Sequence, residues 1–174
     1  VIEKVKEKGI KYTILKPEHT FDYYMTEHKR TKRTGEIVIG LGWATANMRW
    51  CNGYLKRDIL RAYYSQLRKQ YNIIECVGIA ADEEKRLERP NHKQKQKRFP
   101  LVEWGWNEAQ CLEYCYTLGY DWEGLYKQFK RVSCWCCPLQ SLDDLRMLRK
   151  QHPELWKRLN EMDERSPNQF RADY

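Results

Sequence analysis

The strongest strand signal in the chain is the segment Ile73-Ile74-Glu75-Cys76-Val77-Gly78-Ile79-Ala80-Ala81. It is nearly continuous in apolar residues, which is typical of a parallel strand buried on both faces. Asp82-Glu83-Glu84 follows directly, and ligands of open α/β sheets bind outside the carboxyl ends of the strands. We therefore predict a parallel α/β sheet with Asp82 beside a binding site. The alternative for Asp82 is an acid at a turn or helix start.

Helical patterns precede this strand. Apolar residues recur at helical spacing over residues 55–70, and that stripe is expected to be core. A shorter helix is expected over 21–29, and residues 10–15 alternate as a strand does. Helices that alternate with strands indicate the α/β class.

Helix signals also follow the strand. Asn107 and Gln110 form a capping pattern, and Ser141 and Asp144 form another, so a helix is expected after each cap. Pro153 is placed to open a last helix. These signals predict a helical C-terminal part.

Composition indicates a globular protein with a partner of negative charge. The chain has 174 residues, of which 41% are hydrophobic and 13% aromatic, enough for a real core. The net charge of +8 suits nucleic acid, nucleotides or anionic cofactors. A run of about twenty apolar residues and a signal peptide are both missing, so no membrane span is expected. Seven cysteines, an odd number, favour a reducing cytoplasm over a disulfide scaffold.

Three of these cysteines form a C-x-C-C cluster in Ser133-Cys134-Trp135-Cys136-Cys137-Pro138. A C-x-x-C pair places two thiolates within reach of one ion. Cys51 lies at a predicted helix start between Arg49 and Lys56, where the thiolate is favoured. The expected ligand set is Cys51, Cys134 and Cys137 with Cys136 or a helix cysteine, for Zn²⁺ or a [4Fe–4S] cluster, which both suit tetrahedral sulfur. A redox dithiol and unligated thiols stay open.

The segment Lys85–Arg98 is polar and strongly basic. We expect a loop there, either a lid over an anionic ligand or a solvated surface. The sequence contains no G-x-G-x-x-G or Walker motif, which disfavours a P-loop NTPase or a Rossmann dehydrogenase.

Four motifs in order resemble one family. Arg49-Trp50-Cys51 followed by Leu55-Lys56 resembles its R-W-C-x-x-x-L-K element, and Gly78 to Glu83 with Arg86 and Arg89 resembles its G-I-x-A-D-E…R strand end. Pro100-Leu101-Val102-Glu103-Trp104 resembles its P-L-x-x-W element, and the C-x-C-C-P segment is similar to the cysteine hairpin of a bacterial subgroup. The family is the phosphoadenosine phosphosulfate (PAPS) reductase-like family of the PP-loop, or adenine nucleotide α-hydrolase-like, group.

The resemblance implies a partial doubly wound, Rossmann-like parallel sheet flanked by helices. Residues 1–130 would be a partial nucleotide-binding domain, and residues 131–174 a cysteine-rich hairpin with helices packed on it. ATP or adenosine phosphosulfate is the implied ligand. The residues implied to face its phosphate, sulfate or ribose are Arg49, Trp50, Lys56, Asp82, Arg86 and Arg89.

Two departures from the family pattern limit what the resemblance implies. The family's S-G-G-x-D-S phosphate loop should precede Val1, so we expect the chain to be a fragment without turnover of its own. The E-C-G-x-H-type cysteine of true sulfonucleotide reductases is missing, and a single cysteine follows Arg49-Trp50 where iron–sulfur adenylylsulfate reductases carry two. The alternative function is a nucleic-acid-binding, thiolation or phosphorothioation factor with a cysteine-bound Zn²⁺ or Fe–S site. A homodimer stays open.

Overall fold

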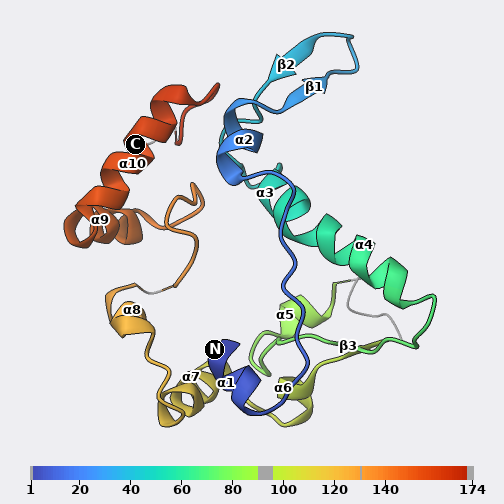
Figure 1. Cartoon of the computed structure of the whole chain (residues 1–174). Helices are drawn as coiled ribbons and strands as arrows, with labels where there is room; N and C mark the ends of the chain where they lie inside the picture. The colour runs from blue at the N-terminus through green and yellow to red at the C-terminus, as the bar shows by residue number, and fades with distance from the viewer. Residues whose placement is uncertain (1, 90–95, 130, 172–174) are drawn as a thin grey trace. The chain divides into compact units, whose positions relative to one another are not determined.

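The computed structural model describes residues 2–89, 96–129 and 131–171 (Figure 1). The chain divides into two compact units. Unit 1 joins Val1–Tyr63 to Ser133–Tyr174, and unit 2 is Tyr64–Val132. The chain returns from unit 2 to unit 1 between Val132 and Ser133, two positions after the boundary predicted between residues 130 and 131. The residues before that boundary, however, belong to both units.

Unit 1 is mostly helical and carries one β-hairpin. Its elements are α1 (Ile2–Glu7), α2 (Phe21–Thr26), β1 (Lys29–Thr31), β2 (Ile37–Ile39), α3 (Trp50–Asn52), the π-helix η1 (Gly53–Arg57), the first part of α4 (Asp58–Leu67), α9 (Leu142–Gln151) and α10 (Pro153–Arg165). The helix predicted over 21–29 is confirmed in shorter form as α2, and the one over 55–70 as η1 and α4.

Unit 2 holds the end of α4, short helices and one strand pair. Its other elements are β3 (Glu75–Cys76), α5 (Glu84–Leu87), β4 (Lys97–Arg98), α6 (Pro100–Glu103), α7 (Glu108–Thr117), the 3₁₀-helix η3 (Trp122–Gly124) and α8 (Leu125–Gln128). Both predicted caps are confirmed: Asn107 and Gln110 form a reciprocal capping box on α7, and the Ser141 side chain accepts from the Asp144 N–H at the start of α9.

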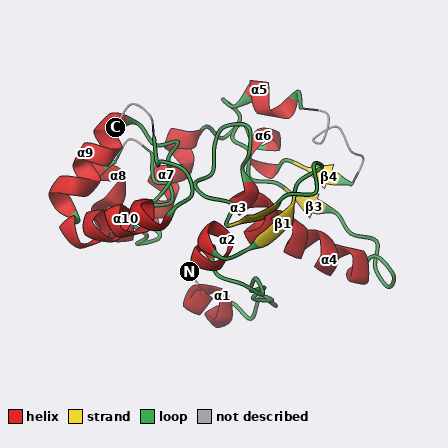
Figure 2. Cartoon of the chain, turned by 90° about the horizontal axis from the view of Figure 1, so that it is seen from above, coloured by secondary structure: helices red, strands yellow, loops and turns green. Residues whose placement is uncertain are grey.

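The described strands form two separate two-stranded sheets (Figure 2). β1 and β2 are antiparallel, and β3 and β4 are parallel. The mixture of helices and strands agrees with an α/β class with a helical C-terminal part. The long strand predicted over 73–81 is reduced to β3, because only Glu75 and Cys76 have ladder partners among the residues that the structure describes. Residues 10–15 form no strand.

The basic segment 85–98 is not simply a loop. It contributes to α5 at its start and forms β4 at its end, where Lys97 and Arg98 pair with β3. Residues 90–95, the middle of the predicted lid, lie outside the described residues. The prediction of a lid therefore stays a prediction.

The core of unit 1 forms around Trp43, which is fully buried. Its indole Nε1 donates to Asp163 Oδ1 on α10 at 2.7 Å, and its ring meets Phe170 edge to face at 4.8 Å. Its backbone N–H donates to Asn168 Oδ1 at 2.6 Å. The segment after α10 thus holds the chain that leads into α3.

The apolar stripe over 55–70 is not the core that its spacing predicts. No residue of α4 is buried, and Leu60 is 43% exposed. The buried positions of unit 1 lie instead in α2, residues 40–44, Trp50, Gly53, α9, α10 and Phe170, where close packing excludes water from the side chains. No helix in the described ranges is long and apolar enough to cross a membrane.

Candidate functional site

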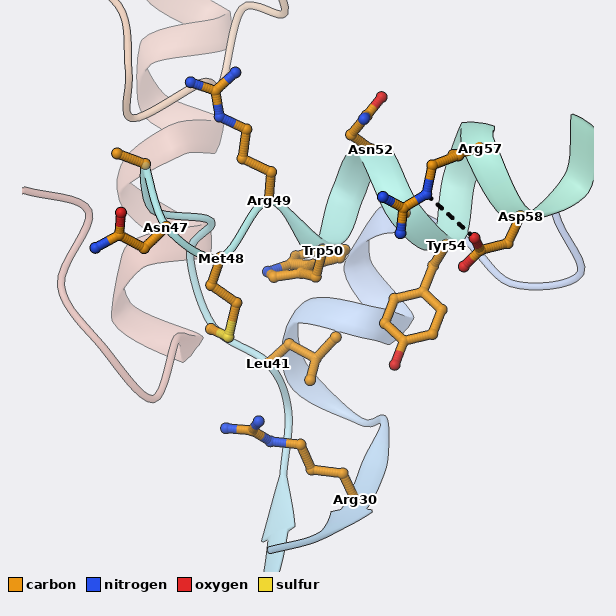
Figure 3. A pocket seen from close by; sticks show the side chains of 12 residues that line it. Arg30, Leu41, Asn47, Met48, Arg49, Trp50, Asn52, Tyr54, Arg57 and Asp58 are labelled. Carbon is orange, nitrogen blue, oxygen red and sulfur yellow. Dashed lines mark hydrogen bonds and ion pairs between the residues drawn. The ribbon is translucent and has the colours of Figure 1, made fainter. Parts of the chain in front are cut away.

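A cavity of about 590 Å³ opens in unit 1 beside the start of α3 (Figure 3). We call it the arginine pocket. It is lined by Arg30, Leu41, Ala46, Asn47, Met48, Arg49, Trp50, Asn52, Gly53, Tyr54, Arg57 and Asp58.

Trp50 belongs to the buried wall of the arginine pocket. It is almost fully buried, and its indole Nε1 donates to the carbonyl oxygen of Gly42 at 3.0 Å. Its ring lies 4.9 Å from that of Phe21 on α2. The sequence predicted Trp50 as a ligand-binding residue, and the structure gives it a packing role at the same place.

Three arginines from three elements give the pocket its charge (Figure 3). Arg30 comes from β1, Arg49 precedes α3, and Arg57 comes from η1. Arg57 Nε lies 3.4 Å from Asp58 Oδ1. Within the described ranges, Arg30 and Arg49 make no ion pair, so their guanidinium groups can receive an anion.

The π-helix η1 supplies both Tyr54 and Arg57 to the pocket. A π turn inside a helix is rare and is frequently found at functional sites. Tyr54 is 41% exposed, and its ring stacks on Tyr24 with 4.9 Å between centroids. Sequence reasoning missed Arg30, Tyr54 and Arg57. Of these three, only Arg57 had a signal in the sequence, because it forms a basic pair with Lys56 at a predicted helix start.

The other predicted nucleotide-binding residues are not in the arginine pocket. Lys56 is exposed on η1 and does not line it. Asp82, Arg86 and Arg89 belong to unit 2, where Arg89 is exposed just after α5.

Asp82 and Arg86 line a second cavity, of about 780 Å³, that lies entirely within unit 2. The Asp82 carboxylate accepts from the backbone N–H of Glu108, at 3.2 Å to Oδ1 and 3.4 Å to Oδ2, so it serves as an acid at the start of α7. Arg86 donates to Glu83, and this hydrogen bond is the main reason that the pKa of Glu83 lies below its usual value. Both predicted residues are thus engaged within the unit.

The cysteine turn, Cys134 to Cys137, is fixed by backbone hydrogen bonds. The Cys137 N–H donates to the carbonyl oxygen of Cys134 at 3.0 Å. The Gln140 side-chain amide donates to the carbonyl oxygens of Cys134 at 2.7 Å and Trp135 at 2.9 Å. The Arg158 guanidinium lies 5.4 Å from the centre of the Trp135 ring. This turn is tight, as the C-x-x-C spacing predicts.

Two thiols of the predicted ligand set, Cys51 and Cys136, have raised pKa values, so the thiolate predicted at Cys51 is not favoured. Burial raises the pKa of Cys51, and the nearby Cys137 and Cys134 raise it further. Burial, with Cys134 next, raises the pKa of Cys136 to about 12. Four sulfur donors suit Zn²⁺ or an iron–sulfur cluster. In the part of the chain that the structure describes, however, no three Cys, His, Asp or Glu side chains converge closely enough to hold an ion.

Comparisons with known proteins give relatives without a described function. No family model matches the sequence, and no solved structure matches it. The chain is 24% identical over 131 residues to the uncharacterized protein MJ0066 of Methanocaldococcus jannaschii, covering 71% of this chain and 27% of that protein. It is also 24% identical over 138 residues to the uncharacterized protein MJ0973 of the same organism, covering 73% of this chain and 32% of that protein. The chain therefore spans about a third or less of the curated relatives it matches.

Proposed function

We propose that this chain is the nucleotide-binding part of a PAPS reductase-like protein and binds ATP or adenosine phosphosulfate in the arginine pocket. The observation that carries the proposal is that Arg30, Arg49 and Arg57 all line one cavity beside Tyr54. The proposal includes the family's doubly wound fold for the whole protein, to which the parallel pair β3–β4 would contribute. Reduction or transfer of sulfur, or release of pyrophosphate, would be the reaction of the whole protein.

The chemistry of the pocket suits a nucleotide. Guanidinium groups bind phosphate or sulfate through paired, charge-assisted hydrogen bonds. Tyr54 offers an exposed aromatic ring to a base, and its stacking on Tyr24 holds it in place. The volume of about 590 Å³ lies in the range of about 300–1,000 Å³ that is typical of small-molecule sites.

Arg49→Gln is expected to raise the dissociation constant for ATP and adenosine phosphosulfate by roughly 10- to 100-fold, because a charge-assisted hydrogen bond is worth about 1.5–3 kcal/mol. Isothermal titration calorimetry of the purified chain measures this change. Arg146→Gln is the matched control, since Arg146 is exposed on α9 and pairs only with Asp143 at 2.9 Å. If the unaltered chain bound no adenine nucleotide, the proposal would be refuted. Equal affinities of the Arg49 and Arg146 variants would mean that the nucleotide does not bind in this pocket.

We also propose Cys51, Cys134, Cys136 and Cys137 as ligands of a [4Fe–4S] cluster or Zn²⁺. The fixed cysteine turn and the nearness of Cys134 and Cys137 to Cys51 support a shared site in unit 1. Such a group would supply electron transfer if it is a cluster, or structural cross-linking if it is zinc. The thiols must lose their protons to bind metal. Metal affinity is therefore expected to fall as the pH falls.

Cys134→Ser with Cys137→Ser is expected to abolish metal binding, because two of four sulfur ligands are lost. Metal analysis of anaerobically purified protein, with the absorbance near roughly 400 nm that a thiolate-held cluster gives, separates iron–sulfur from zinc. Cys76→Ser is the control, since Cys76 is exposed at the end of β3 in unit 2. Metal content that is unchanged in the double variant, or lost equally in the control, would contradict this ligand set.

A further inference from the structure

The β1–β2 hairpin is a basic ribbon in unit 1 (Figures 1 and 2). Its first strand and turn read Lys29-Arg30-Thr31-Lys32-Arg33. The turn is closed by the Gly35 N–H, which donates to the carbonyl oxygen of Lys32 at 3.0 Å, and by the Lys32 N–H, which donates to that of Glu36 at 2.8 Å. Backbone pairing therefore holds four cations on one short ribbon.

Most of this positive charge is unneutralised. Lys32 Nζ lies 2.9 Å from Glu36 Oε2. Within the described residues, Lys29, Arg30 and Arg33 make no ion pair, and all three are exposed. Clustered exposed cations create a positive potential that attracts an external anion.

The two faces of the ribbon differ. Lys29 lies opposite Ile39, so these two share one face, together with Ile37, and the isoleucines are 57% and 66% exposed respectively. Arg30 lies opposite Val38 on the other face and lines the arginine pocket. Arg30 therefore connects the ribbon to the pocket, whereas Lys29 lies on the opposite face.

An aromatic cluster stands at the base of the ribbon. His28, which directly precedes β1, has its ring 5.2 Å from that of Tyr24 and 5.5 Å from that of Tyr54. Tyr54 lines the pocket and is part exposed. Cations beside exposed aromatic rings are typical of surfaces that bind nucleic acid, where cations contact phosphates and rings stack on bases.

We propose that the β1–β2 hairpin binds the phosphodiester backbone of a nucleic acid through Lys29, Lys32 and Arg33. A two-stranded ribbon has the width to enter a nucleic-acid groove. The partner is a polymer rather than a lipid surface, because Arg30, which follows Lys29 on the same strand, lines a pocket of nucleotide size. This inference goes beyond the proposed function, since it concerns the ribbon and does not require a free nucleotide in the pocket.

The test compares two double variants by fluorescence anisotropy with labelled 20-nucleotide single-stranded RNA, single-stranded DNA and duplex DNA. Lys29→Gln with Arg33→Gln is expected to weaken binding about tenfold at roughly 0.1 M salt. It should also reduce the slope of log affinity against log salt concentration by about 1.4 for single strands or 1.8 for the duplex, as the loss of two phosphate contacts predicts. Arg146→Gln with Lys150→Gln removes the same charge from exposed positions on α9 and should change neither quantity.

Each outcome decides the proposal. Binding of any of the three probes that is weakened only by the hairpin variant supports it, and the preferred probe identifies RNA or DNA. Equal losses in both variants, an unchanged salt slope, or no binding at low salt would overturn it. Hairpin-dependent binding to vesicles with anionic lipid that exceeds binding to every nucleic acid would also overturn it. Calorimetry with ATP on the hairpin variant separates the two proposals, because neither Lys29 nor Arg33 lines the arginine pocket.

Discussion

Gly42→Ala is expected to lower the free energy of unfolding of unit 1 by roughly 3 kcal/mol, from backbone strain and a displaced hydrogen bond. Gly42 has a φ of +64°, which L side chains rarely adopt, and an added Cβ would lie 1.8 Å from Asn168 Oδ1. Asn168 would have to move, and the Trp43 N–H, 2.6 Å from that oxygen, would lose its acceptor. Urea unfolding followed by tryptophan fluorescence measures the change.

Gly9→Ala separates steric conflict from backbone strain. Gly9 has nearly the same φ, +63°, but nothing lies within 4 Å of an added Cβ. Gly9→Ala should lower the free energy of unfolding by about 1 kcal/mol, the usual cost of placing an alanine in the left-handed backbone conformation. Asn168→Ala should partly suppress the Gly42 defect, because it removes the clashing atoms. Equal losses at the two glycines would contradict the close approach of Asn168 to the backbone of Gly42.

Asp163→Ala is expected to destabilise unit 1 by about 3 kcal/mol, because two N–H donors lose the carboxylate oxygen that accepts from them. Asp163 Oδ1 accepts from the Trp43 indole at 2.7 Å and from the Phe170 N–H at 2.8 Å. Trp43 is fully buried, so its indole N–H would find no water in exchange. Thermal unfolding followed by circular dichroism should show a midpoint lower by about 10 °C.

Asp163→Asn tests whether the acceptor atom or the space it fills is important. An amide oxygen can accept from both donors, so this variant should retain most of the stability that Asp163→Ala loses. If the asparagine variant were as unstable as the alanine variant, the hydrogen bonds to Asp163 would not be what holds the segment after α10 in place.

The sequence predicts local structure well. The capping box at Asn107 and Gln110 and the cap at Ser141 are confirmed, because each depends on residues three positions apart. The strand over 73–81 is mostly wrong, because a strand needs a partner and β4 offers only two residues. The spacing of apolar residues along one segment carries no information on which strand will pair with it.

The candidate site is predictable where its residues adjoin in the chain. Arg49 was predicted as a binding residue, and it lines the arginine pocket. Arg30 lies nineteen positions earlier, and only the fold brings it to the same cavity. Cys51 and Cys134 are separated by more than eighty positions, yet their thiols are near enough to affect the pKa of Cys51. Both residues belong to unit 1, which explains this proximity. The sequence predicts the two cysteines in one ligand set, but it does not predict that they share a unit.

The composition of unit 1 from both ends of the chain has a consequence for protein synthesis. Trp43 reaches its acceptor on Asp163 only after 120 further residues have been translated. At about 5–20 residues per second, the ribosome needs roughly 6–24 s for that stretch. All of unit 2 leaves the ribosome in this interval, so it can fold first. We expect the Trp43 indole to lack this acceptor until then, and a truncated product that ends before Asp163 would lack it permanently.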